Sequence, residues 1–439
     1  MAIQPSFVEL DSGLEKQFEK FQEGLNGQRE SNWNQSRLAA ASKIGSLEFP
    51  TIRHEEWKYT NVKKIVGNEY AFDLAPDINA DMLKGHHIEG LDAMVLVFVN
   101  GKFNEELSTY EAGNGVEVAN LSDAYATQSE LIEKHFAKYA KFEEDIFTAL
   151  NTAFAYDGAF IHVKKSTEAQ KPILLLNVLD SRNEKVMAQP RNLIIAEDNS
   201  RLSFMEDYLT IGDQDGFINV VTEIFVGKDT TVEHYKLQNK SSNSYFVGTT
   251  QVEQLGNSHY HNTTMTLGGG LIRNNLNIAL NGEHCEAFMT GLYMLNSKDH
   301  VDNHSTVDHL KPNSYSNQLY KGIMDDRSTG VFNGKIFVRE DAQKTNAFQS
   351  NKNILLSDNA TINTKPQLEI WADDVKCSHG CTTGALDEEP LFYLKSRGIP
   401  EQKAKAMLMQ AFANDVLDRI KVDAFKEHIE NLIASRLDV

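Results

Sequence analysis

The clearest pattern along the chain is a series of short apolar or alternating segments between Ala93 and Trp371. The series begins with a continuous apolar run at residues 94–99, followed by the turn signal Asn100-Gly101. Later segments are mostly bounded by Gly, Asn, Asp or Ser, which is typical of strands joined by tight turns. They lie at residues 173–178, 192–196, 220–226, 231–237, 244–252, 276–280, 330–338 and 360–371. A helical interlude near residues 123–156 interrupts the series.

The arrangement of these strands favours a stacked solenoid. They recur at intervals on the order of 10 residues without alternating helices, which argues against a doubly wound α/β sheet and leaves a sandwich, a barrel or a β-solenoid. A run of roughly 200 residues is long for one sandwich. The Asn-rich turns and the small number of prolines, 9 in the chain, suit long parallel ladders, because proline cannot donate a hydrogen bond to them. The pattern therefore predicts a mainly β core over residues 93–385.

The N-terminal region, residues 1–92, is predicted to be helical where the apolar positions of residues 11–44 repeat with helical spacing. After it, residues 53–60 place Trp57 and Tyr59 among charged side chains. Two aromatic rings without a continuous apolar face indicate a segment that packs onto another surface.

The C-terminal region, residues 386–439, is also predicted to be helical. Asp387 is a suitable N-cap, Gly398 is placed to end the first helix, and Pro400 suits the start of the next. In that next helix apolar residues step by four, at Ala404, Leu408, Phe412, Val416 and Ile420. This row is consistent with an intramolecular core or with a docking face for a partner, and the pattern alone leaves both open.

Composition narrows the class of protein. A formal net charge of -19, from 62 acidic and 43 basic side chains, opposes binding to nucleic acid in the absence of a compact basic patch. The first residues lack a basic start followed by an apolar run, and no stretch approaches the roughly 18 to 20 apolar residues of a membrane span. We therefore expect a cytoplasmic protein without a membrane anchor.

The candidate chemistry lies at Cys377-Ser378-His379-Gly380-Cys381. In an extended backbone Cys377, His379 and Cys381 would project from one face, and thiolate and imidazole together suit zinc, copper(I) or iron–sulfur species. Lys376 and a protonated His379 could lower the pKa of the neighbouring thiol. Three ligands do not close a structural zinc site, so a fourth would come from elsewhere. Buried cysteines beside a hydrogen-bonded histidine remain an equally good interpretation of the spacing.

The remaining cysteine and the glycine-rich segments give weaker signals. Cys285 follows His284 in an apparent strand, where ordinary packing is the favoured interpretation. The chain contains neither a phosphate-binding G-x-x-x-x-G-K-[ST] sequence nor a G-x-S-x-G nucleophile motif. The sequence therefore does not support ATP hydrolysis by this chain.

Several sequence blocks carry a family resemblance. They are Arg53-x-x-Glu56-Trp57-Lys58-Tyr59-Thr60, Val331 to Ile336, Gln343-Lys344-Thr345, Gln349, Asn351 to Ser357, Pro366-x-Leu368-Glu369-Ile370, Asp373 to Gly380, and Phe392-Tyr393-Leu394-x-Ser396-Arg397-Gly398-Ile399. In this order the blocks resemble the SufB/SufD family of the SUF iron–sulfur cluster assembly system. The glycine after His379 favours the SufD branch.

The resemblance implies a right-handed parallel β-helix with N-terminal and C-terminal helical parts. It also implies a non-catalytic scaffold subunit for iron–sulfur cluster assembly, which pairs with SufB through the β-helix ends while its C-terminal helices bind the ATPase SufC. ATP hydrolysis would then belong to SufC. A homodimer would be possible without SufB.

The resemblance also implies which residues form the site, by their positions in the matching sequence blocks. Cys377 and His379 would be the metal-proximal pair, and Cys381 a possible additional ligand outside the family's usual pattern. The resemblance implies no tightly bound cofactor on this chain alone, a transient iron–sulfur cluster at the SufB interface, and a flavin associated chiefly with SufB. Docking of the ATPase is expected at Phe392, Tyr393, Leu394, Arg397, Leu408 and Phe412.

Two other classes of function remain to be distinguished from the scaffold. A stand-alone metal-binding or redox protein would use Cys377, His379 and Cys381 and would hold stoichiometric metal without partners. A β-helical carbohydrate-acting enzyme is less favoured, because such enzymes are usually exported and the chain starts without an export signal.

Overall fold

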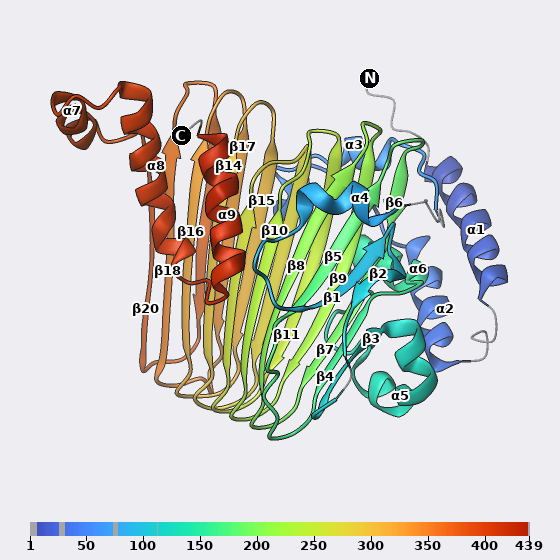
Figure 1. The fold of residues 1–439 in the computed structure, drawn as a ribbon. Helices are drawn as coiled ribbons and strands as arrows, with labels where there is room; N and C mark the ends of the chain where they lie inside the picture. Colours follow the sequence, from blue (N-terminus) through green and yellow to red (C-terminus); the bar gives the residue numbers. More distant parts are fainter. Residues whose placement is uncertain (1–6, 26–30, 73–77, 112, 438–439) are drawn as a thin grey trace.

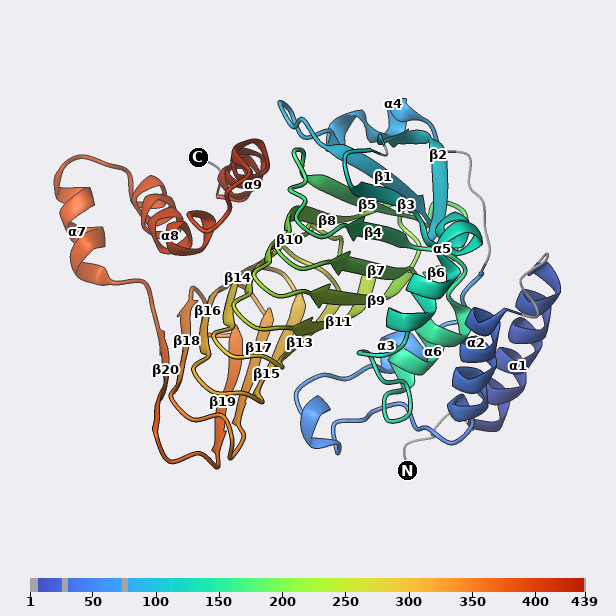
Figure 2. The same ribbon diagram turned by 90° about the horizontal axis from the view of Figure 1, so that it is seen from below.

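The computed structural model describes residues 7–25, 31–72, 78–111 and 113–437. Its body is a parallel β-solenoid in which successive strands alternate between two facing sheets (Figures 1 and 2). The first sheet contains, in spatial order, β2 (Lys102–Thr109), β1 (Met94–Val99), β5 (Ile173–Asp180), β8 (Arg201–Ile211), β10 (Thr231–Gln238), β12 (His259–Thr266), β14 (Glu286–Leu295), β16 (Tyr315–Met324), β18 (Thr345–Leu355) and β20 (Val375–Gly384).

The second sheet runs in the same direction through the molecule. It contains β3 (Val116–Asn120), β4 (Ala159–Val163), β7 (Arg191–Ala196), β9 (Gly216–Val226), β11 (Ser244–Gln254), β13 (Leu271–Leu280), β15 (His300–His309), β17 (Thr329–Val338) and β19 (Thr361–Ile370), with β6 (Val186–Ala188) paired to β9. Pairing is parallel except for β1 with β2 and β3 with β4. The expected mainly β fold, a parallel β-helix with helices at both ends, is confirmed.

The turns explain how a chain without a strict repeat motif stacks so regularly. Between a strand of the second sheet and the next strand of the first, one residue adopts a left-handed backbone conformation in turn after turn. These residues are Asn199, Asp229, Asn257, His284, Asn313 and Lys344. Asn and Asp tolerate positive φ better than most residues with a side chain. The Asn-rich turns noted in the sequence therefore mark the corners of the solenoid.

The core fills the space between the two sheets. Large side chains from both sheets are fully buried there, including Phe204, Tyr208, Phe246, Tyr260 and Tyr293. Burial of such side chains contributes roughly 1.5 to 3 kcal/mol each before entropy is counted. Inward-facing positions alternate with outward-facing ones along each strand, as the period of two requires.

Helices cover the outer faces and the first turns. The N-terminal and interlude helices are α1 (Phe7–Gly24), α2 (Asn32–Ile44), α3 (Lys63–Val66), α4 (Ala80–Leu83), α5 (Leu121–His135) and α6 (Ile146–Phe154), with 3₁₀ turns at Glu55–Trp57 and Lys84–His86. Helix α6 lies on the second sheet, where Phe147 packs against Phe217. Figure 1 shows α1, α2 and α5 at the end of the solenoid opposite to β20.

The charged segment at residues 53–60 lies along the outer face of the second sheet. The guanidinium of Arg273 on β13 lies 4.3 Å from the Trp57 ring centroid, and Trp57 is 8% exposed. Glu56 pairs with Lys335 on β17, and Glu55 with Lys365 on β19. Packing onto another surface is thus confirmed for Trp57, but Tyr59 remains 40% exposed.

The C-terminal helices are α7 (Glu388–Ser396), α8 (Glu401–Leu417) and α9 (Asp423–Arg436). Asp387 caps α7 by accepting a hydrogen bond from the Glu389 amide. Val416, Phe425 and Ile429 are buried against the outer face of the first sheet, so intramolecular packing is confirmed for α8 and α9. In contrast, α7 has no buried residue and projects from the body (Figure 2).

Candidate functional site

The Cys-x-His-x-Cys sequence lies on β20, the last strand of the first sheet. β20 is bonded to β18 along one edge, with Cys377 opposite Ala347 and His379 opposite Gln349. In the described part of the chain no strand pairs with its other edge, and the second sheet ends in the same way at β19. The motif therefore forms part of a solenoid turn that is open on one side.

The three residues share the inward face, as the sequence indicated. Their partners on β18, namely Ala347, Gln349 and Asn351, are all buried, whereas the residues between them are not. Cys377 is half-buried and packs against a small apolar cluster that contains Ala347 and Ala372. His379 and Cys381 are exposed, because among the described residues no further solenoid turn follows β20 to cover them.

The strand geometry limits what the row can bind. Residues two apart in a strand are about 6.6 Å apart, so Cys377 and Cys381 are separated by roughly 13 Å along the backbone. Zinc–sulfur bonds are about 2.3 Å long, so one ion cannot contact both thiols. Among the described residues, no group of three or more His, Cys, Asp or Glu side chains could hold a metal ion. The row can supply Cys377 with His379, or His379 with Cys381, but not a complete ligand set.

The expected activation of the thiol is wrong. Burial raises the pKa of Cys377, and a backbone hydrogen bond at Ala347 offsets only part of this effect. Lys376 cannot compensate, because alternation places it on the opposite face of β20. Burial thus favours the neutral thiol of Cys377, which must lose its proton when it binds a metal.

A chain of buried amides lies beneath the row. Gln349, the neighbour of His379 in the sheet, donates from Nε2 to Oε1 of Gln318 at 2.9 Å, and Ser305 donates to the same oxygen at 3.0 Å. Within the described residues Oε1 of Gln349 has no hydrogen-bond partner. A buried acceptor next to His379 can orient the imidazole by accepting its N–H.

Cys381 lies over a second group of polar side chains. The Tyr293 hydroxyl donates to Asn353 at 2.6 Å and accepts from Asn351 at 3.1 Å. Burial raises the pKa of Tyr293, and the charge of a Cys381 thiolate raises it further. This layer was not predicted from the sequence, although the alternation of Gln349, Asn351 and Asn353 on one face of a strand indicates a polar interior.

Cys285 does not belong to the site. It is fully buried in the core, and its thiol lies 3.2 Å from the carbonyl oxygen of Leu255 and 3.3 Å from that of Gly282. Burial raises its pKa. The interpretation of ordinary packing is confirmed.

The candidate docking residues divide into two groups. Phe392 and Tyr393 on α7 are 73% and 61% exposed, and Arg397 beyond the end of α7 is exposed as well. Leu394 and Leu408 are half-buried. Phe412 faces the solenoid, where the ammonium of Lys321 lies 4.4 Å from its ring centroid. The exposed members of the set are therefore concentrated around α7.

In the part of the chain that the structure describes, no helix combines the length and the apolar character needed to cross a bilayer.

Residues 178–412 match the family described as SUF system FeS cluster assembly, SufBD core domain, and residues 9–175 match the SufBD protein N-terminal region.

Curated relatives agree with this match over nearly the whole chain. A Synechocystis protein named as an iron–sulfur cluster assembly SufBD family protein is 32% identical, with 98% of this chain and 96% of the relative covered. The iron–sulfur cluster assembly protein SufD of Escherichia coli is 29% identical, with 94% of each chain covered. The SufD of Bacillus subtilis is 26% identical, with 91% of this chain and 93% of the relative covered. The chain therefore belongs to the SufBD family of the SUF iron–sulfur cluster assembly system.

Proposed function

We propose that this chain is a scaffold subunit that pairs through its last solenoid turn with a SufB paralogue, so that a nascent iron–sulfur cluster forms between the two chains. The observation that carries the proposal is the open turn itself. Both sheets end there in unpaired edge strands, β19 and β20, and the row of Cys377, His379 and Cys381 faces into the opening.

An open edge favours pairing with another strand. Unpaired N–H and C=O groups form a template for a further strand, and proteins usually protect such edges. At the opposite end the sheets finish in β2 and β3, and helix α5 packs against β3 and β4 there (Figure 1). At the β20 end, Ile370 and Trp371 are 40% and 51% exposed. Large exposed apolar side chains next to free strand edges are typical of an interface.

The chemistry of the row supports a shared site. One thiol and one imidazole hold iron or a cluster incompletely, so the remaining ligands would come from the paralogue. Because burial raises the pKa of Cys377, its binding to a metal has to overcome the loss of a proton, which favours reversible binding of the cluster as a cargo. A resident cofactor on this chain alone is not expected, and a homodimer could form through the same edges when the paralogue is absent.

The exposed helix α7 suits the docking of an ATPase. Phe392 and Tyr393 present aromatic surface on a short helix that packs mainly against α8, whereas α8 lies on β14 and β16 of the first sheet and Phe425 of α9 packs against Tyr235 of β10. A partner that pulls on α7 would thus transmit force through α8 to β14 and β16 of the first sheet. In this proposal SufC hydrolyses ATP and the present chain has no catalytic role.

Two variants test the two surfaces against each other. The full-length chain is co-expressed with SufB and SufC from its own genome, and the complexes are recovered on a tag placed on this chain. Trp371→Glu should reduce recovery of SufB and leave SufC bound. The double variant Phe392→Glu with Tyr393→Glu should reduce recovery of SufC and leave SufB bound. Each variant is the folding control for the other. Retention of SufC by the α7 variant would overturn the docking assignment, and retention of SufB by Trp371→Glu would overturn the pairing.

A further inference from the structure

A strap formed by residues 53–60 crosses four strands of the second sheet on its outer face, and Glu56 holds it to three of them. The carbonyl oxygen of Glu56 accepts a hydrogen bond from Arg273 on β13 at 2.8 Å. Its carboxylate lies 3.5 Å from Nδ1 of His304 on β15 and pairs with Lys335 on β17. The neighbouring glutamate reaches the next strand, β19. The strap therefore extends from the middle of the solenoid to the strand that ends the second sheet.

The end of the strap at β19 carries a carboxylate with unused binding capacity. Glu55 pairs with Lys365 on β19 through Oε1, and within the described residues its other oxygen has no hydrogen bond or ion pair. The side chain of Glu55 is 64% exposed. The hydrogen bond from Lys365 lowers the pKa of Glu55, so the carboxylate is ionised at neutral pH. A second cationic group can therefore bind Glu55 without displacing Lys365.

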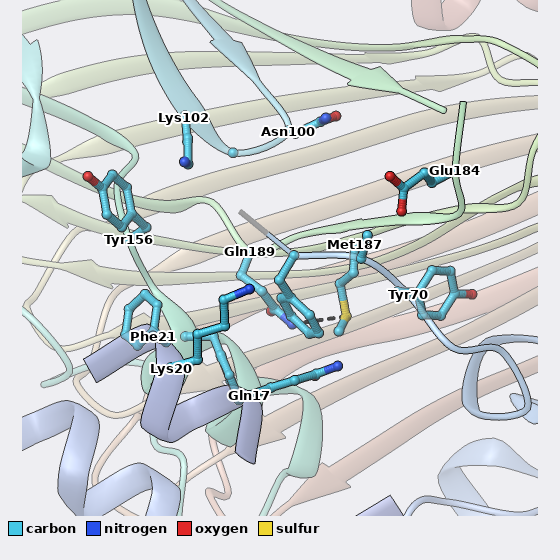
Figure 3. A pocket seen from close by; sticks show the side chains of 14 residues that line it. Gln17, Lys20, Phe21, Tyr70, Asn100, Lys102, Tyr156, Glu184, Met187 and Gln189 are labelled. Atoms are coloured by element: carbon cyan, nitrogen blue, oxygen red, sulfur yellow. Dashed lines mark hydrogen bonds between the residues drawn. The ribbon is translucent and has the colours of Figure 1, made fainter. Parts of the chain in front are cut away.

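The strap is seated on the sheet and leaves no room for a small ligand beneath it. The space that it encloses with Asn333 of β17 has a volume of about 10 Å³, which is about enough for one water molecule. By contrast, a cavity of about 380 Å³ lies at the other end of the molecule between α1, the end of α6 and β6, where Lys102 and Gln189 are among the lining residues (Figure 3). The free oxygen of Glu55 thus suits a partner that approaches along the surface.

The outer face of β19 specifies the register of an added strand only weakly. Its outward positions are all polar, namely Asn363, Lys365, Gln367 and Glu369. Where a face lacks apolar positions, a paired strand can slip by two residues without changing the side that its side chains face, and such a slip moves each side chain by about 6.6 Å. In the proposed pairing, the slip would displace the partner's ligands from His379 by the same distance. Pairing at this edge therefore needs a contact that recognises one register.

We infer that the strap is a register-setting contact of the pairing interface, in which the Glu55 carboxylate receives an outward-facing lysine or arginine from the strand that the paired chain adds beside β19. The inference rests on the proposed pairing. Neighbouring strands lie about 4.8 Å apart, so an outward side chain of the added strand lies beside Lys365 and within reach of Glu55.

The charge pattern of the strap supports a cation at this position. Its two carboxylates already pair with one lysine on β17 and one on β19, so a cation on the next strand continues the row. Trp371, 51% exposed, lies roughly 20 Å further along the same strand from Lys365. Two contacts that far apart, one charged and one aromatic, can both form in one register only.

The test separates the two members of the Glu55–Lys365 pair. The tagged full-length chain is co-expressed with SufB and SufC from its own genome, and recovery of SufB is measured. Glu55→Gln should lower this recovery about two- to fivefold, as expected for one exposed ion pair. Glu55→Lys should lower it about tenfold or more, because attraction becomes repulsion. Lys365→Gln removes the internal pair but leaves Glu55 free for the partner, so it should leave recovery unchanged or raise it. SufC should stay bound in all three variants.

Two further variants make the outcomes distinguishable. Asp92→Asn removes an exposed ion pair with Lys171 beside β1 and β5, and as the matched control it should leave SufB bound. Trp371→Glu reports on the pairing itself: unchanged recovery with this variant would overturn the proposed pairing and the inference with it. If Trp371→Glu reduces recovery but Glu55→Lys does not, the strap contact alone is wrong. Equal losses with Glu55→Gln and Lys365→Gln, or with Glu55→Gln and Asp92→Asn, would also overturn the inference, because Glu55 would then act only within this chain.

Discussion

The interior of the solenoid contains a buried ion pair whose removal should have a large effect on stability. Glu206 on β8 is fully buried, and its Oε2 lies 3.0 Å from Nζ of Lys236 on β10. The Tyr208 hydroxyl donates to the same carboxylate at 3.2 Å, and Thr222 donates to the other oxygen at 2.9 Å. The imidazole of His234 stands 3.7 Å from it. The carboxylate is thus held by one cation and two hydroxyl donors away from water.

Lys236→Met should lower the free energy of unfolding by about 3 to 5 kcal/mol at pH 7, because it leaves the buried charge of Glu206 without its partner. Burial by itself raises the pKa of Glu206, but the charge of Lys236 and the contact with His234 outweigh it and lower the pKa. Without Lys236 the effect of burial dominates, and we expect the pKa of Glu206 to rise. The double variant Glu206→Gln with Lys236→Met removes both charges and should recover most of the loss, since a neutral pair has no such desolvation penalty.

The assay is urea unfolding of the full-length chain followed by far-UV circular dichroism at several pH values. In the wild type, the lowered pKa means that Glu206 stabilises the fold above its unfolded pKa, and that this contribution is lost as the pH falls below it. In Lys236→Met the pKa of Glu206 is raised in the folded state, so the pH dependence of stability has the opposite sign. Acidification then neutralises Glu206 and reduces the loss of unfolding free energy relative to the wild type. Lys228→Met, at an exposed corner, controls for the loss of one lysine.

If Lys236→Met lowers the free energy of unfolding by less than about 1 kcal/mol at pH 7, the reasoning is refuted, because exposed ion pairs contribute in that range. A deficit that grew as the pH fell from 7 to 5 would refute it as well, because the sign of the linkage would be wrong. A double variant no more stable than Lys236→Met would mean that packing by the lysine stem, and not the unpaired charge, was responsible.

Two further predictions concern the site and the segment along the second sheet. His379→Ala should abolish iron–sulfur cluster maturation in cells while the melting temperature of the protein stays unchanged. Cys381→Ser should leave most maturation intact, because Cys381 lies about 13 Å along the strand from Cys377. Normal maturation with His379→Ala would exclude His379 from the mechanism. Contacts with His304 and Lys335 hold the pKa of Glu56 at about 2, below its ordinary 4.5. The ionised Glu56 therefore stabilises the fold above pH 4.5, and this stabilisation is lost as the pH falls toward 2. Glu56→Gln should remove this pH dependence and cost under about 1 kcal/mol at pH 7, since the pair is only half-buried; an unchanged acid profile in urea unfolding would contradict the assignment.

The sequence was a good guide to elements that depend on local patterns. Turn residues such as Asn257 and Asn313 and the caps of α7 are local signals, and they were readable because each is set by the conformation of one or two residues. Strand ends were less certain: the segment expected at 220–226 begins at Gly216, because pairing with β11 extends it. Motif blocks identified the family, whereas the strand pattern alone left three β architectures open.

What the sequence could not give was the side of the sheet that each polar residue faces and what it meets there. Glu206 and Lys236 look like ordinary solvent-facing charges in strands, yet stacking places them inside and in contact. The thiol of Cys377 was expected to be activated by nearby charges, but burial, which only the stacked turn reveals, has the opposite effect on its pKa. Likewise the cavity at Lys102 and Gln189 combines segments from α1 to β6 that no local pattern connects.

The last turns carry polar side chains at the edge that the proposed function assigns to pairing. In the middle of the solenoid the inward face carries Phe204, Phe246 and other large rings, which enclose the ion pair of Glu206 and Lys236. Toward the open end it carries Gln349, then His379 on the final strand. An apolar interior left open would form a large exposed patch and promote aggregation, whereas amides, an imidazole and thiols can be solvated until a partner arrives. In the proposed function the same groups would bind iron or sulfur once water is displaced, so the side chains that keep the open end hydrated would also provide its candidate chemistry.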